Sequence, residues 1–128
     1  MSAGDPERIR WVRYAADCAE RVLGLTGQYR QQAEAAIRAA RAWADNPTEG
    51  LQETCRVAAN AVPLVEGTPA AAASASAAYA AASALFGGRA SLAAAVAVDA
   101  ASMAFANPHH VERAWQAERR RHYGLEGR

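Results

Sequence analysis

Apolar residues recur at three- and four-residue steps along most of this 128-residue chain. That spacing puts them on one face of an α-helix, whereas a half-buried strand would alternate strictly. Short segments rich in proline, glycine and asparagine separate the periodic stretches. The pattern predicts a compact all-α bundle of about six helices, with residues 1–128 forming a single helical domain. The expected helices span about 5–23, 29–45, 49–62, 68–86, 89–105 and 108–123, followed by a frayed tail at 124–128.

Alanine dominates the middle of the sequence and accounts for 36 of the 128 residues. It buries little area, but its small side chain lets helix axes approach closely. We therefore expect tight helix packing supplemented by a few large anchors, which are the three Trp residues, Leu23, Phe86 and Phe105. In the last helix the expected shared face consists of Val111, Ala114, Trp115 and Glu118.

All fourteen basic residues are arginine, and the formal net charge is only +1. A charge this small predicts neither nucleic acid nor an anionic membrane surface as a partner. The basic run 119–121 is short and flanked by glutamates, which is typical of a solvated helix end. The arginine and alanine bias indicates a GC-rich bacterial source. The start of the chain has no apolar leader, and the alanine-rich run is interrupted by charges, so we expect a cytoplasmic protein.

The two cysteines, Cys18 and Cys55, lie in separate predicted helices, and we expect them to be reduced, half-buried small side chains. Nucleophilic chemistry at Cys18 would need a histidine within reach, and all three histidines come late in the chain. The neighbours His109 and His110 would point about 100° apart on a helix, so they do not easily share one metal. The sequence predicts no metal and no cofactor.

Asp99 is the strongest candidate for chemistry, because it is the only charge in its helix after Arg89. A buried carboxylate is costly, so Asp99 should be ion-paired, have a raised pKa, or face a cavity. Together with Tyr79 and Asn60 it could line a small polar pocket across the bundle. If the chain is an enzyme, Asp99, Tyr79 and Asp17 are the candidate acid, base or orienting groups. A structural ion pair at Asp99 and an ordinary core tyrosine at Tyr79 are the competing interpretations.

Three segments resemble an immunity protein family of polymorphic toxin systems. They are YAADCAERVL at Tyr14–Leu23, AIRAARAWA at Ala36–Ala44 and ERAWQAERR at Glu112–Arg120. Members of that family are small all-α bacterial domains, frequent in actinobacteria, which gene context assigns to neutralising a cognate toxin. The resemblance implies a non-enzymatic protein that binds and neutralises or regulates a partner protein.

The partner surface implied by this resemblance would lie on the exposed charged faces of the first, second and last helices, because charged rims steer and specify association. The candidate contact residues are Arg10, Arg13, Glu20, Arg38, Arg41 and Arg121.

An alternative function follows from a departure from the family. Members tend to carry histidines in the middle helices, where this chain has Asn60, Leu85 and Arg89. The scaffold could therefore act as a small-molecule binder or an enzyme of bacterial specialised metabolism, with an apolar pocket between helices. Asn60 and Arg89 would then be binding residues. A homodimer formed through the alanine faces is a third hypothesis.

Overall fold

The computed structural model describes residues 5–63, 68–86, 88–105 and 109–125, apart from the side chains of residues 104, 105 and 109. Within these ranges the chain is helical, without a β-strand, which confirms the predicted all-α fold. The helices are α1 (Pro6–Arg21), α2 (Arg30–Asp45), α3 (Glu49–Asn60), α4 (Pro69–Ala82), α5 (Arg89–Phe105) and α6 (His109–His122). Two 3₁₀ turns, Leu23–Leu25 and Gly27–Tyr29, join α1 to α2.

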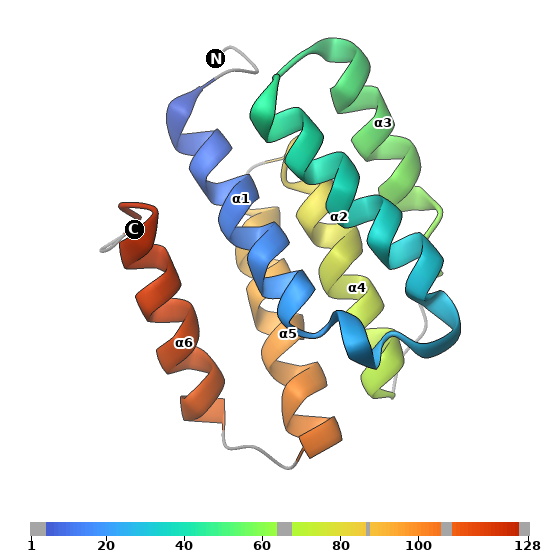
Figure 1. Cartoon of the computed structure of the whole chain (residues 1–128), viewed down its shortest axis with the longest axis vertical. Helices are drawn as coiled ribbons and strands as arrows, with labels where there is room; N and C mark the ends of the chain where they lie inside the picture. The colour runs from blue at the N-terminus through green and yellow to red at the C-terminus, as the bar shows by residue number, and fades with distance from the viewer. Residues whose placement is uncertain (1–4, 64–67, 87, 106–108, 126–128) are drawn as a thin grey trace.

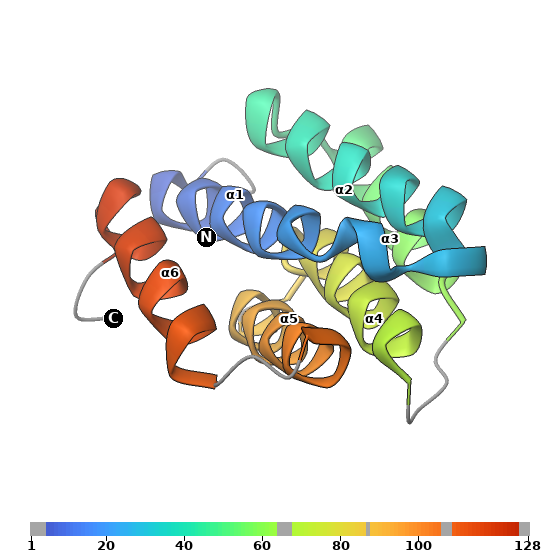
Figure 2. The ribbon, with the colours of Figure 1, turned by 60° about the horizontal axis from the view of Figure 1, so that its bottom comes forward.

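Helix α1 is the centre of the bundle and contacts α2, α4, α5 and α6 (Figure 1). Helices α4 and α5 lie behind it as a closely packed pair, and α3 packs against α2 and α4. Figure 2 shows α6 at the opposite side of the molecule from α3, next to α1 and α5. Positions far apart in sequence, at the start and the end of the chain, are thereby brought together.

Local capping explains where several helices begin. Asp5 accepts a hydrogen bond from the Glu7 amide at 3.4 Å, and Pro6 occupies the first turn of α1. The Thr68 hydroxyl caps α4 in the same way at 3.1 Å, ahead of Pro69. The sequence also has a capping residue followed by proline at Asn107-Pro108, which predicts the start of the last helix and lies outside the described residues.

The core is built mainly from alanine, as the composition predicts. Alanines of α4 and α5 lie between the two helices, and Trp43 of α2 is the largest fully buried side chain. The expectation that Phe86 is an anchor is wrong, because its side chain is 57% exposed. Helices that meet through alanine leave no room for a phenyl ring between them. Leu92 and Met103 of α5 are also exposed for this reason.

Helix α6 turns a different face inward from the one expected. Glu112 and Gln116 are buried, whereas Val111 and Ala114 are exposed. The expected apolar face is therefore wrong for these positions, because α6 is oriented by polar partners on α1 and α5. Trp115 stays partly buried, under the guanidinium of Arg21 at 4.5 Å from its ring centroid.

The expectation of a frayed tail is also wrong for its first two residues. Gly124 adopts a left-handed φ of 72°, which glycine tolerates without steric cost. The Leu125 amide then donates to the Arg120 carbonyl at 2.8 Å, and the Gly124 amide donates to the Arg121 carbonyl at 3.0 Å. This is a Schellman end, and it buries Leu125 completely in an apolar cluster with Tyr14 and Cys18 of α1.

Both cysteines are free thiols and fully buried, deeper than the half-burial expected. Burial raises the pKa of Cys55 to about 11, and burial, with a smaller contribution from Asp17, raises that of Cys18 to about 12. The Cys55 thiol donates to the Ala39 carbonyl at 3.2 Å. None of the described helices has the length and apolar character needed to cross a membrane.

Candidate functional site

A cavity of about 540 Å³ lies between α1, α5 and α6. This volume falls in the range of small-molecule sites in proteins. Helix α1 contributes two aromatic residues, α5 contributes small and apolar residues together with one acid, and α6 contributes a polar wall. The lining residues are Trp11, Tyr14, Ser91, Ala94, Ala95, Val98, Asp99, Arg113, Gln116 and Arg120.

The cavity owes its space to the small side chains of α5. Ala94 and Val98 are buried, and Ala95, one residue further along from Ala94, is exposed at the edge of the cavity. Because alanine ends at Cβ, this side of α5 cannot fill the gap to α6. A groove with an apolar floor is therefore a direct consequence of the alanine-rich sequence.

Two hydrogen bonds fix the polar wall that α6 provides. The Gln116 side-chain amide donates to the Ala94 carbonyl of α5 at 2.8 Å, and Arg120 donates to the Tyr14 hydroxyl of α1 at 3.1 Å. Arg113, Gln116 and Arg120 are spaced at i, i+3 and i+7, so they lie along one side of the helix. The two bonds hold α6 at a set distance from both neighbouring helices.

The aromatic wall consists of Trp11 and Tyr14, which meet edge to face with ring centroids 5.7 Å apart. Burial raises the pKa of Tyr14 well above its ordinary value, so its hydroxyl stays neutral at physiological pH. Trp11 remains partly exposed and also borders a second cavity of about 390 Å³. The two cavities share Trp11 and Ser91, and the second extends toward the start of α1 and the α4–α5 turn.

Asp99 lines the larger cavity, which is one of the three outcomes expected for it, although it is exposed and not buried. Tyr79 and Asn60, which were expected beside Asp99, are not among the described residues that line this cavity. Tyr79 on α4 packs against the buried cluster that contains Val12 and Trp43, and Asn60 is exposed at the last residue of α3. Helix α3, which carries Asn60, lies on the opposite side of the molecule from α6, which forms one wall of the cavity (Figure 2).

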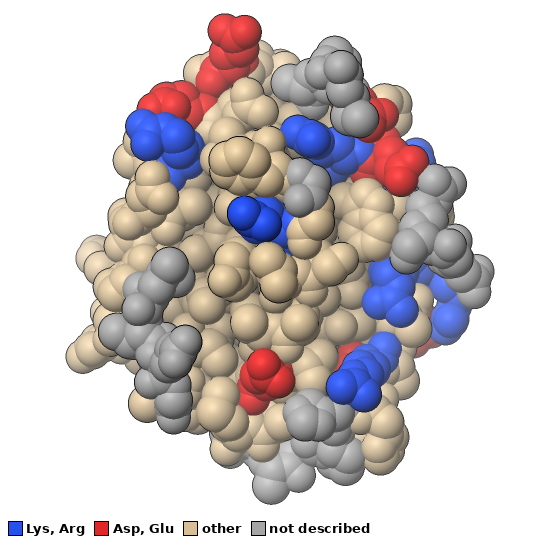
Figure 3. Space-filling model, turned by 180° about the vertical axis from the view of Figure 1, so that it is seen from behind, with Lys and Arg blue, Asp and Glu red and all other residues tan. Residues whose placement is uncertain are grey.

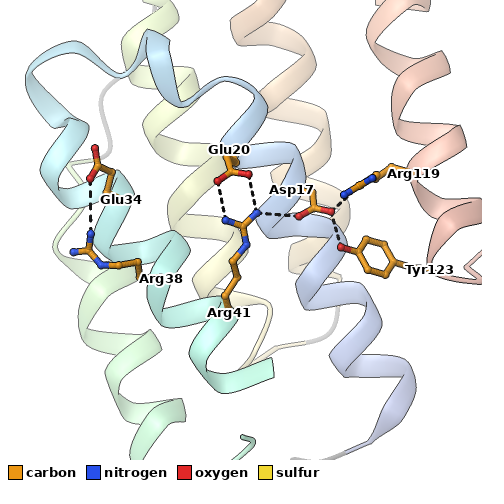
Figure 4. A network of polar contacts seen from close by, with 7 residues as sticks. All are labelled: Asp17, Glu20, Glu34, Arg38, Arg41, Arg119 and Tyr123. Carbon is orange, nitrogen blue, oxygen red and sulfur yellow. Dashed lines mark hydrogen bonds and ion pairs between the residues drawn. The ribbon is translucent and has the colours of Figure 1, made fainter. Parts of the chain in front are cut away.

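Asp17 lies outside this cavity and forms the centre of a polar network between three helices (Figure 4). One carboxylate oxygen accepts from Arg41 of α2 at 2.9 Å. The other accepts from Arg119 at 2.8 Å and from the Tyr123 hydroxyl at 2.6 Å, both near the end of α6. Arg41 also pairs with Glu20 at 2.9 Å. The network therefore ties α2 and α6 to α1.

Electrostatics favour the ionised form of Asp17. Burial alone would raise its pKa, but hydrogen bonds from Tyr123, Arg119 and Arg41 outweigh burial and lower it. Conversely, burial and the bond to Asp17 raise the pKa of Tyr123 to about 12. The ionised carboxylate of Asp17 is therefore the hydrogen-bond acceptor that joins these three helices at neutral pH.

Most of the charged residues proposed as partner contacts are engaged within the chain. Arg13 donates to Asp45 at 3.1 Å and to the Ala44 carbonyl at 3.2 Å, which links α1 to α2. Arg38 lies 3.7 Å from Glu34 in the same helix.

Three other arginines that were expected to contact a partner or ligand are Arg10, Arg121 and Arg89, and each has different surroundings. Arg10 is partly buried, with no hydrogen-bond partner for its Nε among the described residues, and Arg121 is exposed. Arg89 lies over the Phe86 ring at 5.5 Å, at the start of α5.

Sequence reasoning missed the α6 wall and Tyr14 as parts of a site. A usable signal was present, because residues 112, 116, 119 and 123 recur with helical spacing, and so do 113, 116 and 120. These positions are polar, and an inward polar face is recognised only when its partners on another helix are known. The bidentate pair of Arg21 with Glu112, at 2.7 and 3.2 Å, was missed for the same reason.

Comparisons with protein families, with curated proteins and with solved structures find no significant match to this chain. Among the described residues there is also no cluster of histidine, cysteine or carboxylate side chains that could hold a metal ion.

Proposed function

We propose that this chain is a small-molecule-binding helical domain and that the cavity between α1, α5 and α6 is its binding site. One observation carries the proposal. The cavity combines an apolar floor of alanine and valine with a few polar groups held by hydrogen bonds, which is the composition of ligand pockets in general. The charged faces expected to contact a partner protein are instead largely occupied by ion pairs within the chain.

Binding fits the lining better than catalysis does. Among the described residues that border the cavity there is no cysteine or histidine, and Cys18 is buried with a strongly raised thiol pKa. A nucleophile next to an activating base is the usual requirement for covalent catalysis. Tyr14, with its pKa raised by burial, is suited to hydrogen bonding in its neutral form.

Native mass spectrometry of the protein purified from its own host, beside a denatured control, tests this function. We expect a bound small molecule that is released on denaturation. Ala95→Trp should remove it, because an indole placed at the edge of the cavity fills the space. Ala42→Leu is the matched control, since Ala42 is an exposed alanine on α2, away from the cavity. A bare wild-type chain, or a ligand retained by Ala95→Trp, would count against the proposal.

A second candidate is an immunity-like protein that binds and neutralises a toxin. The observation in its favour is an apolar surface, because Phe86, Leu92 and Met103 are exposed near or on α5. Figure 3 shows that the face carrying α4 and α5 has few charged side chains over its middle. Exposed apolar side chains on a face with few charges are compatible with an interaction site. The contact would then lie on this face, away from the charged faces of α1 and α2.

Co-expression with a toxin domain encoded beside this chain tests the second candidate. A one-to-one complex that is lost in Leu92→Asp and kept in Arg38→Gln would support it. Arg38 is the control because it is an exposed charge on α2 that belonged to the expected contact set. A complex lost in Arg38→Gln alone would place the contact on the charged faces instead.

A further inference from the structure

The charge of the cavity indicates what kind of ligand it takes. Two guanidinium groups, from Arg113 and Arg120, and one carboxylate, from Asp99, are the ionised side chains among its described lining residues. The formal charges of these three side chains therefore sum to +1. A low-dielectric floor of alanine and valine strengthens the field of these groups compared with open water.

The two arginines stand on either side of Gln116 along α6. They are two helical turns apart, about 10 Å in rise, and their long side chains can converge on a group placed between them. Arg120 uses Nη1 for the Tyr14 hydroxyl, and a guanidinium has five N–H donors in total. Planar guanidiniums match carboxylate oxygens with two parallel hydrogen bonds, a geometry in which Arg is preferred.

The rest of the cavity is suited to a flat apolar group. Trp11 is partly exposed at the cavity, Ala94 and Val98 form the buried floor, and Ala95 lies at the exposed edge. Aromatic rings gain from edge-to-face or offset contacts with tryptophan beyond their buried area. Because the neighbouring cavity shares Trp11, the apolar group has space to extend past the indole.

We infer that the ligand is a carboxylic acid with an aromatic body, whose carboxylate lies between Arg113 and Arg120 over Gln116 and whose ring packs against Trp11 and the alanine floor of α5. This inference rests on the proposed function, since it names the chemical class bound in the same cavity.

Two probes of matched shape test the ligand class by calorimetric titration or by ¹⁵N NMR shifts. They are 3-phenylpropionate and its neutral analogue 3-phenylpropionamide. We expect the acid to bind and the amide to bind at least about 10-fold more weakly, because the amide lacks the charge that the guanidiniums recognise. For NMR, the largest shifts should occur at Gln116 and at the Trp11 indole.

Arg113→Gln should weaken binding of the acid by about 10-fold or more and leave binding of the amide unchanged. Arg113 is exposed and has no hydrogen bond or ion pair within the described chain that the fold would lose. The matched control is Arg121→Gln, which removes an equally exposed charge from the same helix outside the cavity and should change affinity less than about twofold.

The outcomes separate this inference from the function on which it rests. Equal affinities for acid and amide, or an unchanged affinity in Arg113→Gln, would overturn the carboxylate. If neither probe binds at millimolar concentration but Ala95→Trp still releases the molecule seen in native spectra, the ligand class is wrong and the binding site stands. If Ala95→Trp releases nothing and neither probe binds, both proposals are wrong.

Discussion

Replacing Asp17 with asparagine tests whether a polar network, and not apolar burial, holds α6 to the bundle. The Asp17 carboxylate is only 11% exposed and accepts hydrogen bonds from Arg41, Arg119 and Tyr123. Asparagine preserves the shape but removes the charge and replaces one acceptor oxygen with an N–H donor. That donor would face a guanidinium or hydroxyl that also donates.

The magnitude follows from these contacts. Hydrogen bonds to a charged group contribute about 1.5–3 kcal/mol each, so three of them would suggest about 5–9 kcal/mol. Both arginines are more than a third exposed, Arg41 retains Glu20, and asparagine keeps one acceptor, so solvent screening and the remaining bonds reduce the cost. We expect a loss of about 2–3 kcal/mol, or roughly 8–12 °C in Tm for a domain of this size.

The loss should depend on pH in a defined direction. The folded-state pKa of Asp17 is lowered, so its stabilisation is fully present above the unfolded value of about 3.9 and is lost as the pH falls through the folded value. Asparagine does not titrate. The difference in unfolding free energy between wild type and Asp17→Asn should therefore be constant near neutral pH and shrink below about pH 4.

Urea unfolding followed by circular dichroism at several pH values measures this difference, and amide hydrogen exchange locates it. Exchange should accelerate first in α6. Asp45→Asn is the control, because it removes an exposed carboxylate that also links two helices, and exposed pairs contribute about 0–1 kcal/mol. Equal losses in the two variants, or a loss for Asp17→Asn that does not change below pH 4, would refute the reasoning.

Three further predictions concern the rest of the chain. Leu125→Ala should lower the unfolding free energy by about 2–4 kcal/mol in urea unfolding, since the fully buried side chain leaves a cavity beside α1 and α5. Cys18 and Cys55 should not react with a disulfide reagent at pH 8 until urea unfolds the chain, because burial raises both thiol pKa values. The free energy of unfolding should also fall above about pH 8.5, because only the unfolded chain releases the thiol protons there. Phe86→Ser should change stability by less than about 1 kcal/mol while reducing retention on a hydrophobic column, as expected for an exposed ring.

The helices were predictable from sequence because their signals are local. Asp5-Pro6 and Thr68-Pro69 mark starts through side-chain capping and a fixed φ, and neither depends on distant residues. The ends of the helices were predicted less accurately than their starts. For example, α4 ends at Ala82, four residues before the predicted limit at Phe86, because alanine offers no change in pattern where the helix stops.

Which face of each helix points inward was much harder to predict. In α5, alanine lies on every side, so the sequence does not show which side of this helix faces the core, and the structure leaves the larger Leu92 and Met103 exposed. In α6, the inward face is set by Asp17, Tyr14 and Ala94, which lie 22 to 106 positions away in sequence from their α6 partners. The cavity lies between α5 and α6, so it is affected both by the uniform alanine pattern of α5 and by the distant partners of α6. Of its charged lining residues, only Asp99 could therefore be identified from the sequence.

The floor and the opposite wall of the cavity belong to parts of the molecule that differ in how far they tolerate substitution. Its floor belongs to the tightly packed alanine helices, where a larger residue would clash and a smaller one would leave a void. Its opposite wall belongs to one side of α6, a helix held by hydrogen bonds to α1 and α5 and by the packing of Trp115 and Leu125. Under the proposed function, substitutions at Arg113 would alter ligand preference with little effect on the fold, whereas Gln116 and Arg120 also hold α6 in place through their hydrogen bonds.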